Sequence, residues 1–190
     1  MKTIGDAMAL LHEYTQGESL RRHAYAVAAA MRAYAERFGE DPDTYEMTGL
    51  LHDFDYERYP DLSQHTVVGA RILREQDWPE EIVHAILAHN DRNGVARDTL
   101  LAKTLYACDE LSGFVMAVAM VKPTRDLRDV SVKSVKKKLK DKTFARGVNR
   151  DDVYRGAEEL GVALEEHIEM VIGALTRVAA RLGLNGQESA

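Results

Sequence analysis

The chain has 190 residues, of which 45% are hydrophobic and 29% charged, with a net charge of −6 at pH 7. This length fits one domain with a sizeable core, and the composition is ordinary for a soluble globular protein. The single cysteine, Cys108, excludes an intrachain disulfide and favours a reducing compartment. No run of about 20 apolar residues predicts a membrane span, and no signal-peptide pattern is present at residues 1–6. We therefore expect a cytoplasmic protein.

Helical periodicity and helix boundary signals run through the first part of the chain. A helix is predicted over residues 19–38, with Ser19 as its N-cap and Gly39 as its stop. A second helix is predicted over residues 41–54, with Pro42 in its first turn. A third helix, over residues 63–76, places His65 in its first turn, and a fourth covers residues 80–89. The intervening stretches 55–62 and 90–96 are predicted loops.

A long apolar helix follows, capped by Asp98 and running to about Met120, with Asp109 inside it. Pro123 then breaks the chain. Two shorter amphipathic helices are predicted over residues 130–140 and 151–160, and a last one over residues 164–182. No strand alternation, repeat or low-complexity tract is found. The sequence therefore predicts an all-α protein, a single domain over residues 1–190.

Charge is distributed unevenly along these elements. Residues 131–150 carry a charge of +7, which leaves −13 for the other 170 residues. A concentrated positive patch on an acidic protein attracts anions, phosphates above all. The alternative is a solvated helix face without a ligand. The basic residues of this segment are Lys133, Lys136, Lys137, Lys138, Lys140, Lys142, Arg146 and Arg150.

The most informative feature is the adjacent pair His52 and Asp53, which closes the apolar helical run of residues 45–51. Such groups rarely end a buried apolar run unless something satisfies them. The pair can aim a nitrogen and a carboxylate at one point, and the carboxylate can bridge two cations. Imidazole and carboxylate together suit Zn, Fe or Mn, and a helical bundle can collect ligands from facing helices. The further candidates, each of which alone could be a structural residue, are His23, His65, His89 and Asp109.

The order of these residues on successive helices resembles the HD superfamily of metal-dependent phosphohydrolases. The strings 22–27, 49–53 and 107–111 carry the resemblance. It implies an HD-domain helical bundle with short C-terminal helices, made of an HD core over about residues 19–120 and a basic helical extension over about residues 121–184. Strings after residue 109, including residues 132–138 and 144–150, are similar to a bacterial group of HD hydrolases of unassigned substrate.

The resemblance also implies a set of metal ligands. One divalent ion would be held by His23, His52, Asp53 and Asp109, and a second would share Asp53 and take His65 and His89. The alternative is one ion, with the last two histidines lining the pocket. Fe, Mn, Zn, Mg and Ni are all compatible with these ligands. We find no Gly-Tyr-Pro signature, which argues against the cyclic dinucleotide branch of the superfamily.

The predicted reaction is hydrolysis of a small phosphorylated or nucleotide-type substrate by a metal-activated hydroxide. Asp53 would bridge or anchor the metals, and Asp55 or Glu57 would assist proton transfer. The alternative for Asp55 and Glu57 is a role in a surface loop. Many relatives have a glycine where this chain has Asp55 and a phosphate-binding lysine near it, so Arg58 is the candidate for that cationic role. The basic segment would fold over the pocket and contact the substrate phosphates through Lys133, Lys137 and Arg146.

Two other functions remain open at this stage. A diiron oxygenase would use the same six ligands, and a non-catalytic nucleotide-binding regulator would keep the fold without turnover. Nucleic acid is disfavoured as a partner, because Phe144 is the only aromatic residue of the basic segment and base stacking needs aromatic side chains. The C-terminal helix could pack on its own core or on a second copy, so both a monomer and a homodimer are compatible with the sequence.

Overall fold

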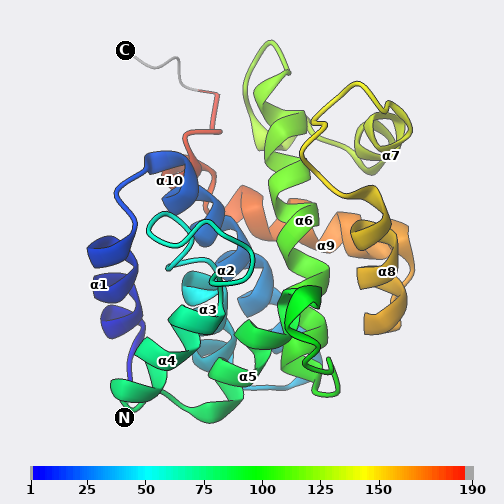
Figure 1. Cartoon of the computed structure of the whole chain (residues 1–190). Coiled ribbons are helices and arrows are strands. Elements are labelled where there is room, and N and C mark those ends of the chain that lie inside the picture. The colour runs from blue at the N-terminus through cyan, green and yellow to red at the C-terminus, as the bar shows by residue number, and fades with distance from the viewer. Residues whose placement is uncertain (1, 187–190) are drawn as a thin grey trace.

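The computed structural model describes residues 2–186 of the chain. Within this range it contains helices and no β-strand, which confirms the predicted all-α fold (Figure 1). None of the described helices is long and apolar enough to cross a membrane. The first five helices are α1 (Ile4–Tyr14), α2 (Glu18–Phe38), α3 (Pro42–Leu51), α4 (Val67–Glu75) and α5 (Glu80–His89). The others are α6 (Leu100–Met120), α7 (Val132–Lys140), α8 (Arg150–Leu160), α9 (Leu164–Arg177) and α10 (Ala179–Leu182).

Helices α2 and α6, with 21 residues each, lie at the centre of the bundle. Helix α2 packs against α3, α6 and α9, and α6 packs against α5 and α8 (Figure 1). The buried face of α2 is rich in alanine, which lets its neighbours approach closely. One core of buried residues connects these helices from α1 to α10. The predicted division into a core and a basic extension near residue 120 stays a prediction.

Two glycines set the distances between helices near the site. A Cβ atom on Gly49 of α3 would lie 2.6 Å from the Cα atom of Ala28 in α2. A Cβ atom on Gly156 of α8 would lie 2.8 Å from the Cα atom of Ala107 in α6. Both contacts are closer than side-chain atoms allow, so each pair of helices meets backbone to backbone. The two contacts fix the positions of His52, one turn after Gly49, and of the α8 surface beside α6.

Several predicted boundaries are wrong by a few residues. Helix α2 begins at Glu18 with Gly17 as its N-cap, so Ser19 lies inside the helix. Thr99, one residue after Asp98, caps α6 through its side chain. The last predicted helix is interrupted at Val178, which has non-helical backbone angles and separates α9 from α10.

The largest difference concerns the predicted helix over residues 63–76. Helix α4 begins only at Val67, because Thr66 has a φ of +66° and cannot continue a right-handed helix. His65 therefore lies in the turn before α4 rather than in its first helical turn. A β-branched residue at positive φ is rare and is held there by its surroundings.

Candidate metal centre

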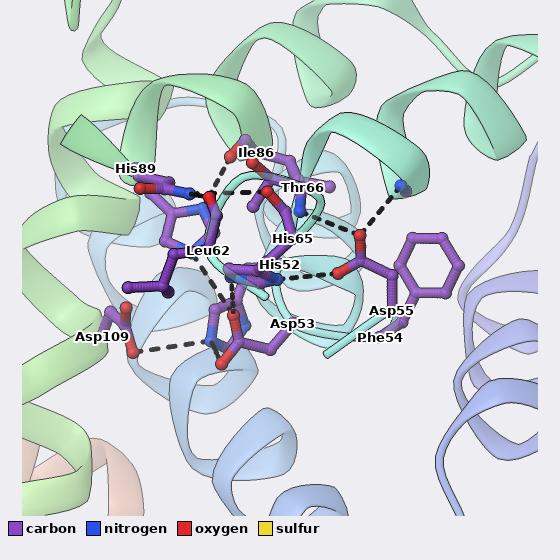
Figure 2. A network of polar contacts seen from close by, with 12 residues as sticks. His52, Asp53, Phe54, Asp55, Leu62, His65, Thr66, Ile86, His89 and Asp109 are labelled. Carbon is purple, nitrogen blue, oxygen red and sulfur yellow. Dashed lines mark hydrogen bonds and ion pairs between the residues drawn. The ribbon is translucent and has the colours of Figure 1, made fainter. Parts of the chain in front are cut away.

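Six side chains converge at the middle of the bundle from five different segments (Figure 2). All but His65, which lies in the turn before α4, belong to a helix or directly follow one, so helix packing largely decides where the potential ligand atoms lie. They form two groups of three, and within each group the potential ligand atoms lie within 4.8 Å of one another. The first group is His23 of α2, His52 after α3, and Asp109 of α6. The second group is Asp53 after α3, His65 before α4, and His89 at the end of α5.

The first group is organised around Asp109. Its Oδ1 atom lies 2.9 Å from Nε2 of His23 and 3.5 Å from Nε2 of His52. The two imidazole Nε2 atoms are 3.2 Å apart. Ligands that share one ion at about 2.1 Å lie about 3.0 to 3.4 Å from each other in octahedral or tetrahedral geometry. The donor types and spacing of this group therefore fit a divalent cation.

Asp53 connects the first group to the second. Its Oδ1 atom lies 3.1 Å from Nε2 of His65 and 3.3 Å from Nε2 of His89. Its Oδ2 atom faces the other way and lies 3.4 Å from Nε2 of His52. One carboxylate thus directs one oxygen at each group, which is the arrangement required of a bridging ligand.

Backbone carbonyls orient two of the imidazoles. Nδ1–H of His52 donates to the carbonyl oxygen of Gly49 at 2.8 Å, and Nδ1–H of His89 donates to that of Ile86 at 2.6 Å. With the proton on Nδ1, the lone pair of Nε2 is directed into the cluster in both residues. This is the tautomer that a metal ligand needs.

A buried carboxylate, Asp55, performs the same task for His65. Nδ1–H of His65 donates to Oδ1 of Asp55 at 2.9 Å, and Oδ2 accepts the backbone N–H groups of Thr66 and Gly69, each at 2.9 Å. Asp55 is only 1% exposed and lies beyond His65 as seen from Asp109 (Figure 2). A Cβ atom on Gly69 would lie 2.8 Å from Oδ2, so only glycine leaves room for this carboxylate. This placement does not support the predicted role of Asp55 in proton transfer. Its carboxylate contacts Nδ1 of His65, whereas Nε2 of the same ring is the atom that faces the cluster.

The charges of the cluster shift its protonation equilibria. Burial disfavours the charged imidazole of His65, but Asp53 and Asp55 outweigh burial and raise its pKa to about 9. Burial likewise opposes ionisation of Asp109, yet His52 and His23 hold the pKa of its carboxyl well below the usual range. Cations and protons therefore compete for these nitrogens, so cation binding releases protons and weakens as the pH falls.

An open cavity of about 1440 Å³ leads to the cluster. A stripe of residues along α6, from Tyr106 through Asp109 and Gly113 to Met120, lines one side at helical spacing. The N-terminal half of α8 and the preceding residues 147–149 line another side. The sequence contained a signal for the α6 stripe, since these residues share one face with Asp109. No local signal pointed to α8, which approaches the cavity only through its packing on α6.

Two exposed tyrosines and two arginines are part of the cavity wall. Tyr56 packs edge-on against His65, with ring centroids 5.1 Å apart, and is 36% exposed, while Tyr154 is 44% exposed. Nε of Arg155 donates to the hydroxyl of Tyr106 at 2.7 Å, which holds its guanidinium at the wall. Arg92 is the second arginine of the lining.

The cationic residues predicted from the sequence lie elsewhere. Arg58 stacks its guanidinium on the ring of Tyr14, 4.0 Å from the centroid, and points toward α1. Lys133 and Lys137 line a separate groove beside α7, and Arg146 is exposed in the following loop. None of these four residues lines the cavity. Their predicted contact with a phosphate inside the pocket therefore has no support from the geometry.

Residues 20–113 match the family model of the HD domain, and all six clustered residues fall inside this range. The chain contains an HD domain. The HD domain accounts for the helical fold and for the capacity to hold divalent cations, as the resemblance implied. The segment that supplies α7 and α8 lies outside the matched range.

Curated relatives of this HD-domain chain carry the name Ribonuclease Y. The protein from Lawsonia intracellularis is 36% identical over 101 residues, which are 53% of this chain and 19% of that protein. The protein from Geobacter metallireducens is 27% identical over 163 residues, 85% of this chain and 29% of that protein. The chain thus spans less than a third of the length of these relatives. No solved structure matches the chain.

Proposed function

We propose that this chain is a phosphohydrolase that depends on two divalent cations and cleaves a phosphoester of a nucleotide-type substrate, RNA included. The observation that carries the proposal is the position of Asp53, with one oxygen toward each of two ligand groups. When bound, such a pair of cations acidifies water and neutralises phosphate oxygens. The ligands would be His23, His52 and Asp109 for one ion, His65 and His89 for the other, and Asp53 for both.

The charge of the cavity supports the dependence on cations. Seven carboxylates line it against two arginines, Arg92 and Arg155. A phosphate would be repelled by this surface unless cations at the cluster reversed the local charge. Arg155, held in place by Tyr106 and paired with Asp152 at 2.9 Å, would then contact the phosphate from the α8 side of the cavity.

Residues of the chain restrict and orient the reacting groups. Asp55 would keep the proton of His65 on Nδ1, so that Nε2 stays directed at the cluster. The carbonyl groups of Gly49 and Ile86 would do so for His52 and His89. Imidazole rings whose orientation is fixed in this way would hold the cations in constant positions while a substrate enters and leaves.

The names of the relatives favour RNA, which weighs against the expectation that nucleic acid is a disfavoured partner. That expectation considered the aromatic residues of the basic segment alone. The cavity lining contains tyrosines outside that segment, and two of them are exposed: Tyr56 after α3 and Tyr154 on α8. Each ring is partly exposed and could stack on a nucleobase.

The decisive experiment measures metal content and hydrolysis together. We expect about two equivalents of Fe or Mn per chain after purification without chelators, and cleavage of bis-p-nitrophenyl phosphate that a chelator abolishes and the cation restores. His89→Gln should lose one equivalent and at least 100-fold in turnover. His84→Gln is the matched control, because His84 lies on the same helix but pairs with Asp98 at 3.0 Å, outside the cluster.

Other results would contradict the proposal. A folded protein that binds no divalent cation would favour a non-catalytic regulator. Two equivalents of iron with an oxygen-dependent product and no phosphoester cleavage would favour the diiron oxygenase.

A further inference from the structure

The basic segment forms a surface of its own outside the cavity. Five of its cations are exposed, and within residues 2–186 none of the five forms an ion pair. The other cations of the segment have partners: Lys136 pairs with Glu165, Lys138 lies over the ring of Phe144, and Arg150 binds backbone carbonyls. We call the five exposed residues the basic surface: Lys133, Lys137, Lys140, Lys142 and Arg146.

The first three residues of the basic surface are aligned on one face of α7. Val135 and Leu139 anchor the opposite face in the core, so the spacing i, i+4 and i+7 directs Lys133, Lys137 and Lys140 outward together. Like charges at these spacings repel one another and destabilise the helix. The alignment is therefore unfavourable for the isolated fold and becomes favourable when an anion lies along the helix.

The other two residues, Lys142 and Arg146, lie in a loop that connects α7 to the cavity. The guanidinium of Arg150 organises this loop by donating to the carbonyl groups of Ala145 at 2.7 Å and Val148 at 2.8 Å. Residues 147–149, directly after Arg146, form part of the cavity wall. The basic surface thus continues along the chain from α7 to the edge of the cavity.

We propose that the basic surface binds the phosphodiester backbone of a single-stranded RNA whose cleaved end occupies the cavity, an inference that rests on the proposed function. The surface would contact phosphates rather than bases, because its one aromatic ring, Phe144, packs edge-on against Phe114 at 5.5 Å and is covered by Lys138. The remainder of the protein carries a net charge of −13 and would repel the strand elsewhere.

This arrangement predicts that affinity depends on substrate length. We expect a strand of about 20 nucleotides to bind more tightly than a dinucleotide, because only the longer strand has enough phosphates to contact both the cavity and the basic surface. Each phosphate contact with single-stranded nucleic acid contributes about 0.7 to the slope of log affinity against log salt concentration. Loss of three lysine contacts should therefore lower that slope by about 2.

The test compares two triple variants that remove the same charge. Lys133→Ala with Lys137→Ala and Lys140→Ala alters the basic surface. Lys2→Ala with Arg71→Ala and Arg74→Ala alters α4 and the segment before α1, at the opposite side of the molecule from α7 (Figure 1). Both are made in the Asp109→Asn background, so that a fluorescein-labelled 20-nucleotide single-stranded RNA stays intact while its binding is measured between 50 and 300 mM salt.

We expect the α7 variant alone to bind the RNA about tenfold more weakly at low salt and with the reduced slope. In the Asp109-containing protein, the same variant should cleave bis-p-nitrophenyl phosphate at the wild-type rate. Equal RNA binding by both triple variants would overturn the proposal, as would binding of anionic lipid vesicles in place of RNA. If the RNA binds as expected and no phosphoester is cleaved, the proposed function fails while the RNA surface stands.

Discussion

At the scale of single residues, the centre depends on groups that do not themselves face the cavity. Asp55 is the clearest of these, since its carboxylate accepts one N–H from the His65 ring and two from the backbone of the turn that carries that ring. The same carboxylate therefore fixes both the ring and the unusual positive φ of Thr66. A positioning role of this kind is expected to affect cation affinity more than it affects the fold.

Replacement of Asp55 by Asn should weaken the second cation site selectively. The Asn amide cannot accept three N–H groups as the carboxylate does, so His65 loses its fixed orientation. We expect about 10- to 100-fold weaker binding of the second equivalent of Mn²⁺ and unchanged binding of the first, measured by calorimetry. Equal affinity for both equivalents in the variant and the wild type, with normal helical content by circular dichroism, would refute the role of Asp55.

His167 provides a residue-scale prediction that is independent of the centre. It is buried on α9, where Nε2–H donates to the carbonyl of Ala107 at 2.8 Å and Nδ1 accepts the hydroxyl of Tyr34 at 2.6 Å. Burial favours the neutral ring and lowers its pKa to about 4. The unfolded chain, with a histidine pKa near 6.5, binds this proton more readily, so the contribution of His167 is complete above about pH 6.5 and declines as the pH falls toward 4.

The size of this effect should be about 3 kcal/mol between pH 7 and pH 4. His167→Gln removes the titrating ring, so its free energy of unfolding should be lower than that of the wild type at pH 7.5 and should decline less at pH 5. Urea denaturation of both proteins at the two pH values measures the difference. An equal decrease in the free energy of unfolding of both proteins between pH 7.5 and pH 5 would show that His167 does not cause this pH dependence.

At the scale of elements, close helix contacts carry the ligands to one point. The contact of Gly49 with Ala28 brings the end of α3 against α2, and the contact of Gly156 with Ala107 brings α8 against α6. Neither contact tolerates a Cβ atom without movement of a backbone, because the nearest atoms belong to the main chain of the facing helix.

Gly49→Ala should therefore destabilise the fold and disturb the centre together. Overpacking at a helix contact costs roughly 1 to 3 kcal/mol, and displacement of α3 moves both His52 and Asp53. We expect weaker binding of both equivalents of Mn²⁺ and a lower denaturation midpoint. Gly173→Ala on α9 is the control, since a Cβ atom there would meet nothing within 4 Å and alanine favours a helix. A Gly49 variant as stable as the control would contradict the packing argument.

At the scale of the whole molecule, the centre unites segments that are far apart in the chain. The clustered residues come from segments between α2 and α6. Two of them that are in contact, His23 and Asp109, are 86 positions apart in the chain. A cation that bridged these segments would bind the folded state and would have no comparable site in the unfolded chain. We therefore expect folding and cation binding to be coupled.

Addition of Mn²⁺ at 100 times its dissociation constant should stabilise the folded protein by about 2.7 kcal/mol per site. We expect a higher melting temperature by calorimetry, and a smaller increase for Asp109→Asn. Melting temperatures that do not respond to Mn²⁺, Fe²⁺ or Zn²⁺ in the wild type would argue against a cation site that spans the bundle.

The sequence by itself indicated most of the helices, to within a few residues at their ends, and identified the residues that now lie together. Short-range signals suffice for these features: the helix start at residues 41–42 and the stop at Gly39 act within one turn, and His52 and Asp53 are adjacent in the chain. The resemblance to the HD superfamily then grouped the remaining four candidate ligands, and the structure brings all six residues together.

Only the tertiary structure decided which neighbouring residues serve the centre and which do not. Asp55 and Arg58 both follow the pair closely, yet one turns toward His65 and the other toward Tyr14, because the irregular turn before α4 leaves side-chain directions to long-range contacts. The helix α8 wall, with Tyr154 and Arg155, likewise depends on packing against α6. Periodicity predicts what a helix presents to its own surface, whereas the partner that this surface meets is fixed by the packing of the whole chain.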